Sequence, residues 1–173
     1  MRPGNSIQQK QFDRPGLIRQ MARWRLLGKK VVFTNGCFDI LHTGHIASLT
    51  EAAQHGDVLI VAVNSDDSVK KLKGPNRPLN DEASRALLLA ALVMVDAVII
   101  FPEDTPRDLI VALQPDVLVK GGDYKIEDIA GAKEVLSWGG QVFQNPIVAG
   151  FSTSGLIEKI QQNDNAERLQ NGK

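Results

Sequence analysis

The sequence predicts an α/β protein built on a doubly wound, five-stranded parallel sheet, and three observations lead to this fold class. First, five short runs are apolar and rich in β-branched residues, as strands buried on both faces are. Second, segments with helical spacing separate these runs, which favours parallel strands joined by right-handed helical crossovers. Third, the unusual polar side chains cluster after the strands, where ligands bind in such sheets. The five runs lie at 30–36, 57–66, 96–101, 115–122 and 141–146.

The first elements of this alternation are a helix, a strand and a second helix. Asp13 and Pro15 mark the start of the first helix, apolar residues follow at helical spacing, and Gly28 ends it. The strand at 30–36 comes next. The segment at 42–56 has helical spacing and is closed by Gly56.

The remaining helices are delimited by caps, prolines and glycines. The segment 68–80 is polar and rich in glycine and proline, so we expect a short helical turn followed by a loop. Thr105 is the expected N-cap of a helix that has Pro106 at its first position. The further helices are predicted at 81–95, 105–114, 126–140 and from 152 onwards.

The chain length and composition indicate one domain of an ordinary globular protein. With 173 residues, we assign 1–28 to an N-terminal extension and helix, 29–162 to the functional domain and 163–173 to a polar tail. Basic and acidic side chains number 20 each, so no overall charge attracts nucleic acid or a membrane. Cys37 is the only cysteine and no apolar run reaches membrane-spanning length, so we expect a cytoplasmic protein without a membrane segment.

Two of the three histidines flank a glycine in the stretch TNGCFDILHTGH, residues 34–45, directly after the first strand. If the second helix begins near Thr43, then His42 and His45 lie on one side of its first turn. Free backbone N–H groups and the positive end of the helix dipole gather there, which is typical of an anion site. Gly44 would let a phosphate approach the backbone closely. This arrangement favours a triphosphate ligand.

Other interpretations of these residues remain open. The histidines could ligate a metal, although H-x-x-H alone lacks a third ligand, or they could be incidental residues at a solvated helix start. Cys37 could be a nucleophile, but Phe38 and Ile40 beside it favour a small packed residue. The third histidine, His55, stands alone near a helix end and indicates a solvated side chain.

The stretch TNGCFDILHTGH and the later STSGLI together resemble the two phosphate motifs of the cytidylyltransferase-like nucleotidyltransferases. Within that superfamily, VAVNSDDSVKKLKGPNRPLN, DAVIIFPEDTPRDLIVALQPDVLVKGGDY and IAGAKEVLSWGGQV are similar to the heptose 1-phosphate adenylyltransferases of ADP-heptose synthesis. The resemblance covers roughly 17–160 and implies a Rossmann-like nucleotidyltransferase fold. It also implies a stand-alone form, with the sugar kinase that is fused to many relatives on another chain.

The resemblance implies roles for individual residues. His42 and His45 would contact the ATP phosphates, Lys73 would approach the triphosphate, and Arg85 would reach a substrate or nucleotide phosphate. These four are the expected catalytic residues, and no residue is assigned to a metal. The expected nucleotide-site residues are Thr34, Asn35, Gly36, Phe38, Asp39, Gly44, Asn64, Gly121, Asp123, Ser152, Thr153 and Ser154.

The expected reaction moves AMP from ATP to D-glycero-β-D-manno-heptose 1-phosphate, giving ADP-heptose and pyrophosphate for the lipopolysaccharide core. A sugar phosphate brings its own anionic nucleophile, so the enzyme can act by alignment and charge stabilisation, with Mg²⁺ carried by the ATP oxygens. One alternative is a CTP-dependent cytidylyltransferase that uses glycerol 3-phosphate. Another is a nucleotide-binding module without enzymatic activity. A homodimer through apolar positions of the first helix, Trp24 and Leu27, is also expected.

Overall fold

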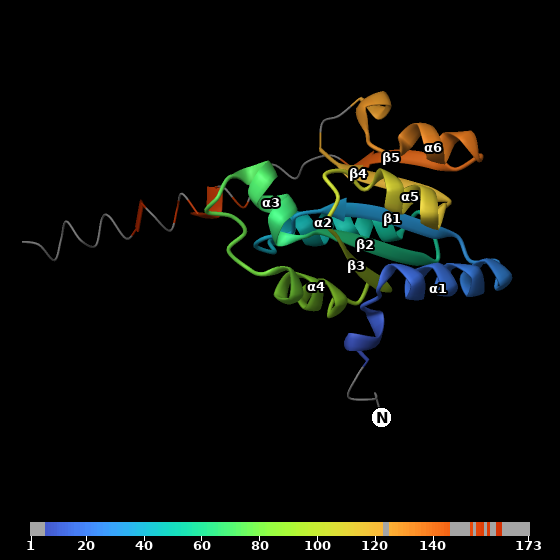
Figure 1. Ribbon diagram of the computed structural model, residues 1–173, viewed down its shortest axis with the longest axis horizontal. Helices are drawn as coiled ribbons and strands as arrows, with labels where there is room; N and C mark the ends of the chain where they lie inside the picture. Colours follow the sequence, from blue (N-terminus) through green and yellow to red (C-terminus); the bar gives the residue numbers. More distant parts are fainter. Residues whose placement is uncertain are drawn as a thin grey trace, which may run out of the picture.

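The computed structural model describes residues 6–122, 125–145, 153, 155–157, 159 and 162–163. Strands and helices alternate along most of this part of the chain (Figure 1). The strands are β1 Val31–Gly36, β2 Val58–Asn64, β3 Ala97–Phe101, β4 Val117–Gly121 and β5 Gln141–Asn145. The α-helices are α1 Arg14–Leu26, α2 Thr43–Ala53, α3 Asp66–Lys73, α4 Glu82–Ala90, α5 Arg107–Leu113 and α6 Ala132–Ser137, and the 3₁₀ helices are η1 Gln8–Lys10 and η2 Ile126–Asp128.

The five strands form one parallel sheet in the order β3-β2-β1-β4-β5. β1 is the central strand, and Thr34 pairs with Val61 of β2 on one side and Val119 of β4 on the other. The strand order reverses between β1 and β4, which is the switch point where ligands bind in doubly wound sheets. The predicted fold class is therefore confirmed.

Helices cover both faces of the sheet, and each face has its own apolar core. One core packs α1, α5 and α6 against alternate strand residues such as Phe33 and Leu118. The other packs α2 and α4 against their neighbours, such as Val32 and Val119. The period of two along buried strands thus decides which helix layer each strand residue meets. Helix α1, which we assigned to the N-terminal extension, places Leu17 and Met21 fully in the first core.

The structure differs from the expected elements at three places. Residues 66–73 form a full helix rather than one turn, because Ser65 accepts a hydrogen bond from the Ser68 amide, acidic residues start the helix and lysines end it. Helix α5 takes Pro106 as its N-cap instead of Thr105. The helix expected at 126–140 is divided into η2 and α6 at Gly131, where φ is +88° and a side chain would collide with Ile110.

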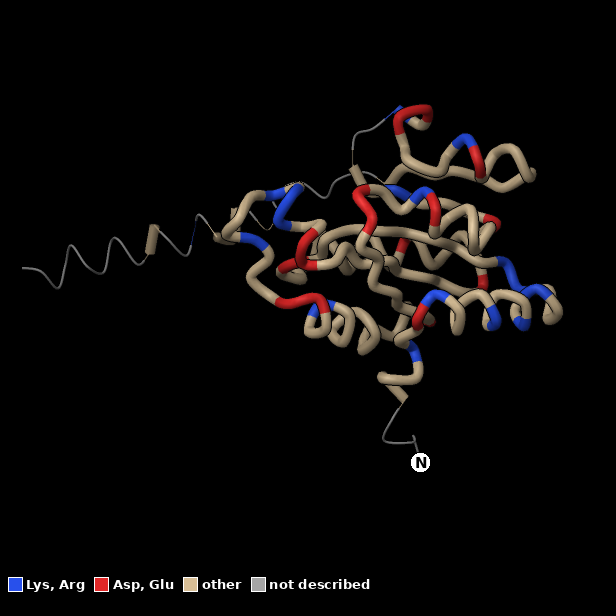
Figure 2. Tube along the Cα trace, viewed as in Figure 1, with Lys and Arg blue, Asp and Glu red and all other residues tan. Residues whose placement is uncertain are grey.

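Charges of both signs are distributed along the chain, with basic residues on α1 and α3 (Figure 2). Within the described residues, no helix is long and apolar enough to cross a membrane.

Candidate active site

The first turn of α2 brings the two predicted histidines into direct contact. His42 is the N-cap residue, with extended backbone and no side-chain cap, and His45 lies one turn into the helix. Their rings stack with centroids 3.8 Å apart, and the Phe38 ring packs edge-on against His45 with the ring centroids 5.3 Å apart. Both Nδ1 atoms are buried and lack a hydrogen-bond partner among the described residues. The pair therefore presents polar ring atoms at a helix N-terminus.

Burial decides the charge of this pair. It lowers the pKa of His45 to about 4, with a further contribution from the nearby His42 that outweighs the hydrogen bond to the Ile40 backbone. Burial also lowers the pKa of His42. Both imidazoles are therefore neutral at pH 7, and each can donate one hydrogen bond. A polyanion bound beside them would favour the charged form, because an opposite charge raises the pKa of a histidine.

The loop between β1 and α2 has a strained backbone at Phe38. Its φ is +49°, in the left-handed region that a bulky residue rarely adopts. The Phe38 ring lies over Gly36, where an added Cβ would come within 3.0 Å of it. This backbone conformation places the Phe38 ring against both Gly36 and His45.

The carboxylate of Asp39 connects this loop to the segment before α4. Its buried carboxylate accepts hydrogen bonds from Arg77 Nε at 2.5 Å, the Leu79 amide at 2.7 Å and the Asn80 amide at 3.0 Å. Burial would raise the pKa of Asp39, but these hydrogen bonds together outweigh it and hold the pKa below its ordinary value. The carboxylate therefore stays ionised and joins the β1–α2 loop to residues 77–80.

Arg85 lies beneath the same region and is fully buried. Its guanidinium donates to the carbonyl of Cys37 at 2.6 Å, to the carbonyl of Asn80 at 3.0 Å and to the Asp66 carboxylate at 2.8 Å. We expected this side chain to reach a phosphate. In the structure it instead connects the β1–α2 loop, the segment before α4 and the start of α3.

The three lysines of α3 have different surroundings. Lys70 and Lys71 form exposed ion pairs with Asp67 and Asp104, both at 3.2 Å. Lys73, at the end of the helix, lies close enough to Cys37 to lower its pKa, although burial raises the pKa of this thiol overall. Cys37 therefore stays protonated, which fits the packed role we expected. Lys73 is exposed, and among the three lysines it is the one whose charge acts on Cys37.

The carboxyl ends of the strands supply the other predicted polar groups. Thr34 and Asn64 are buried, and Asn64 donates to Ser68 Oγ at 3.0 Å. Asn35 accepts a hydrogen bond from Lys120 Nζ at 3.2 Å. At Gly121, an added Cβ would lie 3.3 Å from Ser48 Oγ on α2. Gly44 lies in the first turn of α2.

Thr153, in the second phosphate motif, contacts the loop that carries the first phosphate motif. Thr153 is helical, and its hydroxyl lies 3.5 Å from the Ile40 carbonyl in the β1–α2 loop, 113 positions earlier in the chain. Asp123, Ser152 and Ser154, together with Tyr124, lie outside the described residues.

Sequence reasoning missed three residues of this region: Lys120, Arg77 and Asn145. Lys120 lies near the carboxyl end of β4, in the stretch KGGDY, which was a usable signal. Asn145, fully buried at the end of β5, donates to the Ser48 carbonyl at 2.9 Å, and Arg77 binds Asp39. Both act through partners distant in sequence, so no local pattern reveals them.

The carboxylates near the site do not fit a dedicated Mg²⁺ cage. Asp39, Asp66 and Glu103 are engaged with Arg77, Arg85 and Arg14. Among the described residues, no group of three histidine, cysteine or carboxylate side chains is placed to hold a metal ion.

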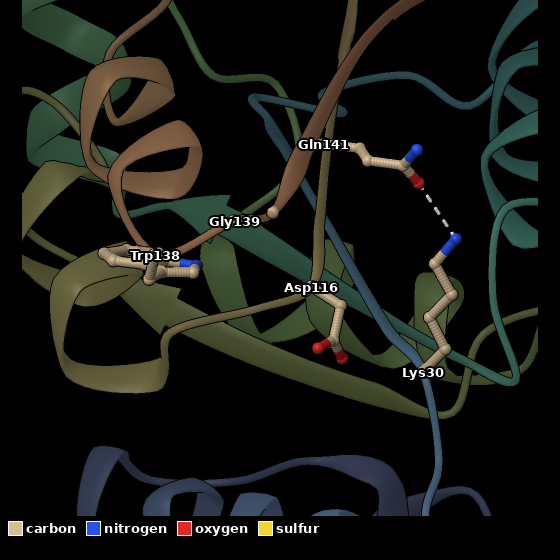
Figure 3. A pocket seen from close by; sticks show the side chains of 6 residues that line it. Lys30, Asp116, Trp138, Gly139 and Gln141 are labelled. Carbon is tan, nitrogen blue, oxygen red and sulfur yellow. Dashed lines mark hydrogen bonds between the residues drawn. The ribbon is translucent and has the colours of Figure 1, made fainter.

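A separate pocket of about 370 Å³ lies at the opposite, amino-terminal edge of the sheet (Figure 3). Lys30 donates to Gln141 there at 3.0 Å. Its other polar groups serve the fold, because Asp116 accepts from the Val31 amide and Trp138 donates to a backbone carbonyl. We therefore place the active site at the carboxyl edge.

Comparison with known proteins identifies the family to which this chain belongs. Residues 33–159 match the cytidylyltransferase-like family. The chain is 56% identical over 152 residues to the bifunctional protein HldE of Koribacter versatilis, covering 88% of this chain and 31% of that protein. It is 57% identical over 143 residues to the bifunctional protein HldE of Hyphomonas neptunium, covering 83% of this chain and 29% of that one. It therefore spans less than a third of these curated relatives.

A crystal structure described as the lipopolysaccharide core biosynthesis protein from Thermoplasma volcanium GSS1 has the same fold. The TM-score is 0.57 at 33% identity, and the match covers 70% of this chain and 98% of that one. Together, the parallel sheet, the H-x-G-H helix start and these relatives define a nucleotidyltransferase. The chain belongs to the cytidylyltransferase-like family.

Proposed function

We propose that this chain transfers AMP from ATP to D-glycero-β-D-manno-heptose 1-phosphate, releasing pyrophosphate and forming ADP-heptose. The observation that carries the proposal is the stacked pair of His42 and His45 at the N-terminus of α2, with Thr153 of the second motif against the same loop. Helix N–H groups and imidazole donors at one point suit the charge that develops on a departing pyrophosphate.

The choice of heptose phosphate rests on the resemblance of the strand-end segments to the heptose 1-phosphate adenylyltransferases. The relatives named as bifunctional HldE, and the structural relative named for lipopolysaccharide core biosynthesis, support the same choice. We also propose that a separate sugar kinase in the same pathway supplies the phosphorylated sugar. We place the reaction in the cytoplasm because ATP is the donor, and we propose a homodimer.

The chain supplies alignment and charge stabilisation in this proposal. His42 and His45 would contact the triphosphate, Lys73 would approach it, and Gly44, Thr153, Ser152 and Ser154 would contribute close backbone or hydroxyl groups. Gly121 and Asp123 would line the nucleotide or sugar pocket. Mg²⁺ would accompany the ATP oxygens, and no residue of the chain is assigned to it. Arg85 would position the loop from beneath.

Pyrophosphate release measured across the four nucleoside triphosphates and a panel of phosphates tests the proposal. We expect turnover with ATP and heptose 1-phosphate, with preference for the β-anomer and none with the free sugar. A hexose 1-phosphate should react roughly ten- to a hundredfold more slowly, since a buried polar group without its partner costs about 1–3 kcal/mol. Turnover of CTP with glycerol 3-phosphate alone would instead assign the cytidylyltransferase reaction. Nucleotide binding without any pyrophosphate release would assign a binding module.

A further inference from the structure

We propose that Lys120 binds the phosphate of the sugar acceptor, on the side of the active site opposite the histidine pair. This inference rests on the proposed function and adds a specificity-determining residue to it. Lys120 is the fourth residue of β4, next to the central strand at the switch point of the sheet.

The position of Lys120 follows from the strand pairing. Leu118 belongs to the core on the α1, α5 and α6 face, whereas Val117 and Val119 face α2 and α4. Side chains two apart on a strand share a face, so Lys120 leaves the sheet on the face away from α2. Its hydrogen bond to Asn35 confirms this, because Asn35 shares a face with Phe33 of the same core.

Lys120 also lies within electrostatic range of a second cation. Burial lowers the pKa of Lys120, and the Lys73 ammonium lowers it further. The positive potentials of the two ammonium groups thus overlap near the carboxyl end of β4. A phosphate bound between them would relieve their mutual repulsion and favour the charged forms of both.

The geometry of the reaction requires two separate anion-binding sites, one for the pyrophosphate and one for the acceptor phosphate. An oxygen of the sugar phosphate attacks the α-phosphorus of ATP, forming a P–O bond. The bond from that phosphorus to the bridging oxygen breaks, and the electron pair leaves with pyrophosphate. In an in-line displacement, the attacking phosphate and the departing pyrophosphate lie on opposite sides of the α-phosphorus. The histidines at the α2 N-terminus suit the pyrophosphate, and Lys120 on the other face suits the attacking phosphate.

The electrostatic interaction between Lys73 and Lys120 fits the same step. Lys73 is assigned to the triphosphate, and the acceptor phosphate must approach the α-phosphate closely to react. The cation that neutralises the acceptor therefore has to lie next to the cation that serves the donor. Asn35 would hold the Lys120 side chain in the direction that achieves this.

The test is steady-state kinetics of pyrophosphate release by the full chain, with ATP and heptose 1-phosphate varied separately. The variants are Lys120→Met, which keeps the length and apolar stem, and Lys120→Arg, which keeps the charge. Lys71→Met is the matched control, since Lys71 forms an exposed ion pair with Asp104. Circular dichroism and the melting temperature verify that each variant is folded.

We expect Lys120→Met to raise the KM for heptose 1-phosphate at least tenfold and to change the KM for ATP less than twofold. Lys120→Arg should recover part of the loss, and Lys71→Met should resemble the wild type. A raised KM for ATP with an unchanged KM for the sugar phosphate would overturn the inference and assign Lys120 to the nucleotide. If Lys120→Met is unfolded, Lys120→Arg and Asn35→Ala decide by the same comparison. A wild-type chain inactive with this substrate pair would contradict the proposed function itself, which separates the two failures.

Discussion

The stacked histidines at the start of α2 combine the position we propose for the triphosphate with a cost to stability. Their rings are 3.8 Å apart in a partly buried place, and burial keeps both neutral. A neutral imidazole presents a donor without the desolvation penalty of a buried cation. Because a triphosphate favours protonation of the pair, binding and charge on these residues are linked.

Replacing His45 with alanine tests the assignment of the pair. We expect kcat to fall about a hundredfold or more, the scale for losing one group that stabilises transition-state charge. The melting temperature should change little, because a polar first-turn residue adds little to either core.

His55→Ala is the matched control, since this histidine stacks on Phe143 at 4.0 Å rather than on the α2 N-terminus. Turnover close to wild type in the His45 variant would remove that residue from the mechanism.

The acid dependence of stability gives a second test of the same residue. The folded-state pKa of His45, about 4, lies below the ordinary value of 6.5. Between these two pH values the unfolded chain binds a proton that the folded chain does not, so stability is lost as the pH falls through this window.

Urea unfolding at several pH values measures this loss. We expect the free energy of unfolding to fall less steeply between pH 6.5 and 4 in His45→Gln than in the wild type. Parallel curves for the two proteins would show that His45 is not the group responsible.

At the scale of elements, the three lysines of α3 are all exposed but differ in their surroundings. Lys70 and Lys71 pair with carboxylates in solvent, where an ion pair contributes little. Lys73 is placed by the end of the helix at Gly74, whose φ of +98° turns the chain toward the anchor at Asp39. The helix thus sets which lysine acts through its charge on Cys37.

We therefore expect Lys73→Ala to reduce kcat/KM much more than Lys71→Ala does. The reason is that only the Lys73 ammonium of this pair lies near Cys37 and Lys120. Kinetic assay of the two alanine variants is sufficient. Equal and small effects in the two variants would show that Lys73 is a solvated surface residue with no role in the reaction.

Arg85 of α4 joins three segments, and its loss should disturb all of them. We expect Arg85→Met to lower the free energy of unfolding by about 3 kcal/mol, since removing one partner of a buried charged pair leaves the other uncompensated. The KM values for both substrates should rise, because the β1–α2 loop near both of them is loosened.

Chemical denaturation and substrate titrations distinguish the two possible roles of Arg85. A variant as stable as the wild type, with only the KM for ATP raised, would identify Arg85 as the phosphate ligand that we first expected.

At the scale of the whole molecule, the sheet is a rigid support between two helix layers. Leu118 is fully buried near the centre of one core, one strand from β1. We expect Leu118→Ala to lower the free energy of unfolding by about 2–5 kcal/mol, through lost burial and the cavity it leaves.

Val93→Ala is the control, because this side chain is 94% exposed and its loss should stay within about 0.5 kcal/mol. Urea denaturation of both variants gives the comparison. Equal losses would mean that the described core does not carry the stability of the fold.

Much of the fold and of the site could be predicted from the sequence, because the signals are local. Alternation of apolar strands with helical spacing indicated the parallel sheet, and Asp13 does cap α1 by accepting from the Gly16 amide. The histidines were found because a helix start and a glycine are visible in twelve residues. The length of α3 was underestimated because the glycine and prolines after it favour a loop, whereas the Ser65 cap and the charges at its two ends extend the helix.

The sequence by itself determined the fold class, the edge of the sheet where the site is expected, and the histidine pair at a helix start. Only the tertiary structure decided that Arg85 is buried beneath the loop, that Asp39 is held by residues 77–80, and that Lys120 of β4 donates to Asn35 of β1. The physical reason is the distance along the chain over which each kind of interaction acts. Caps and periodicity act within one or two turns of the chain, whereas the charge and partners of a buried side chain depend on strands and helices that meet only when the sheet is assembled.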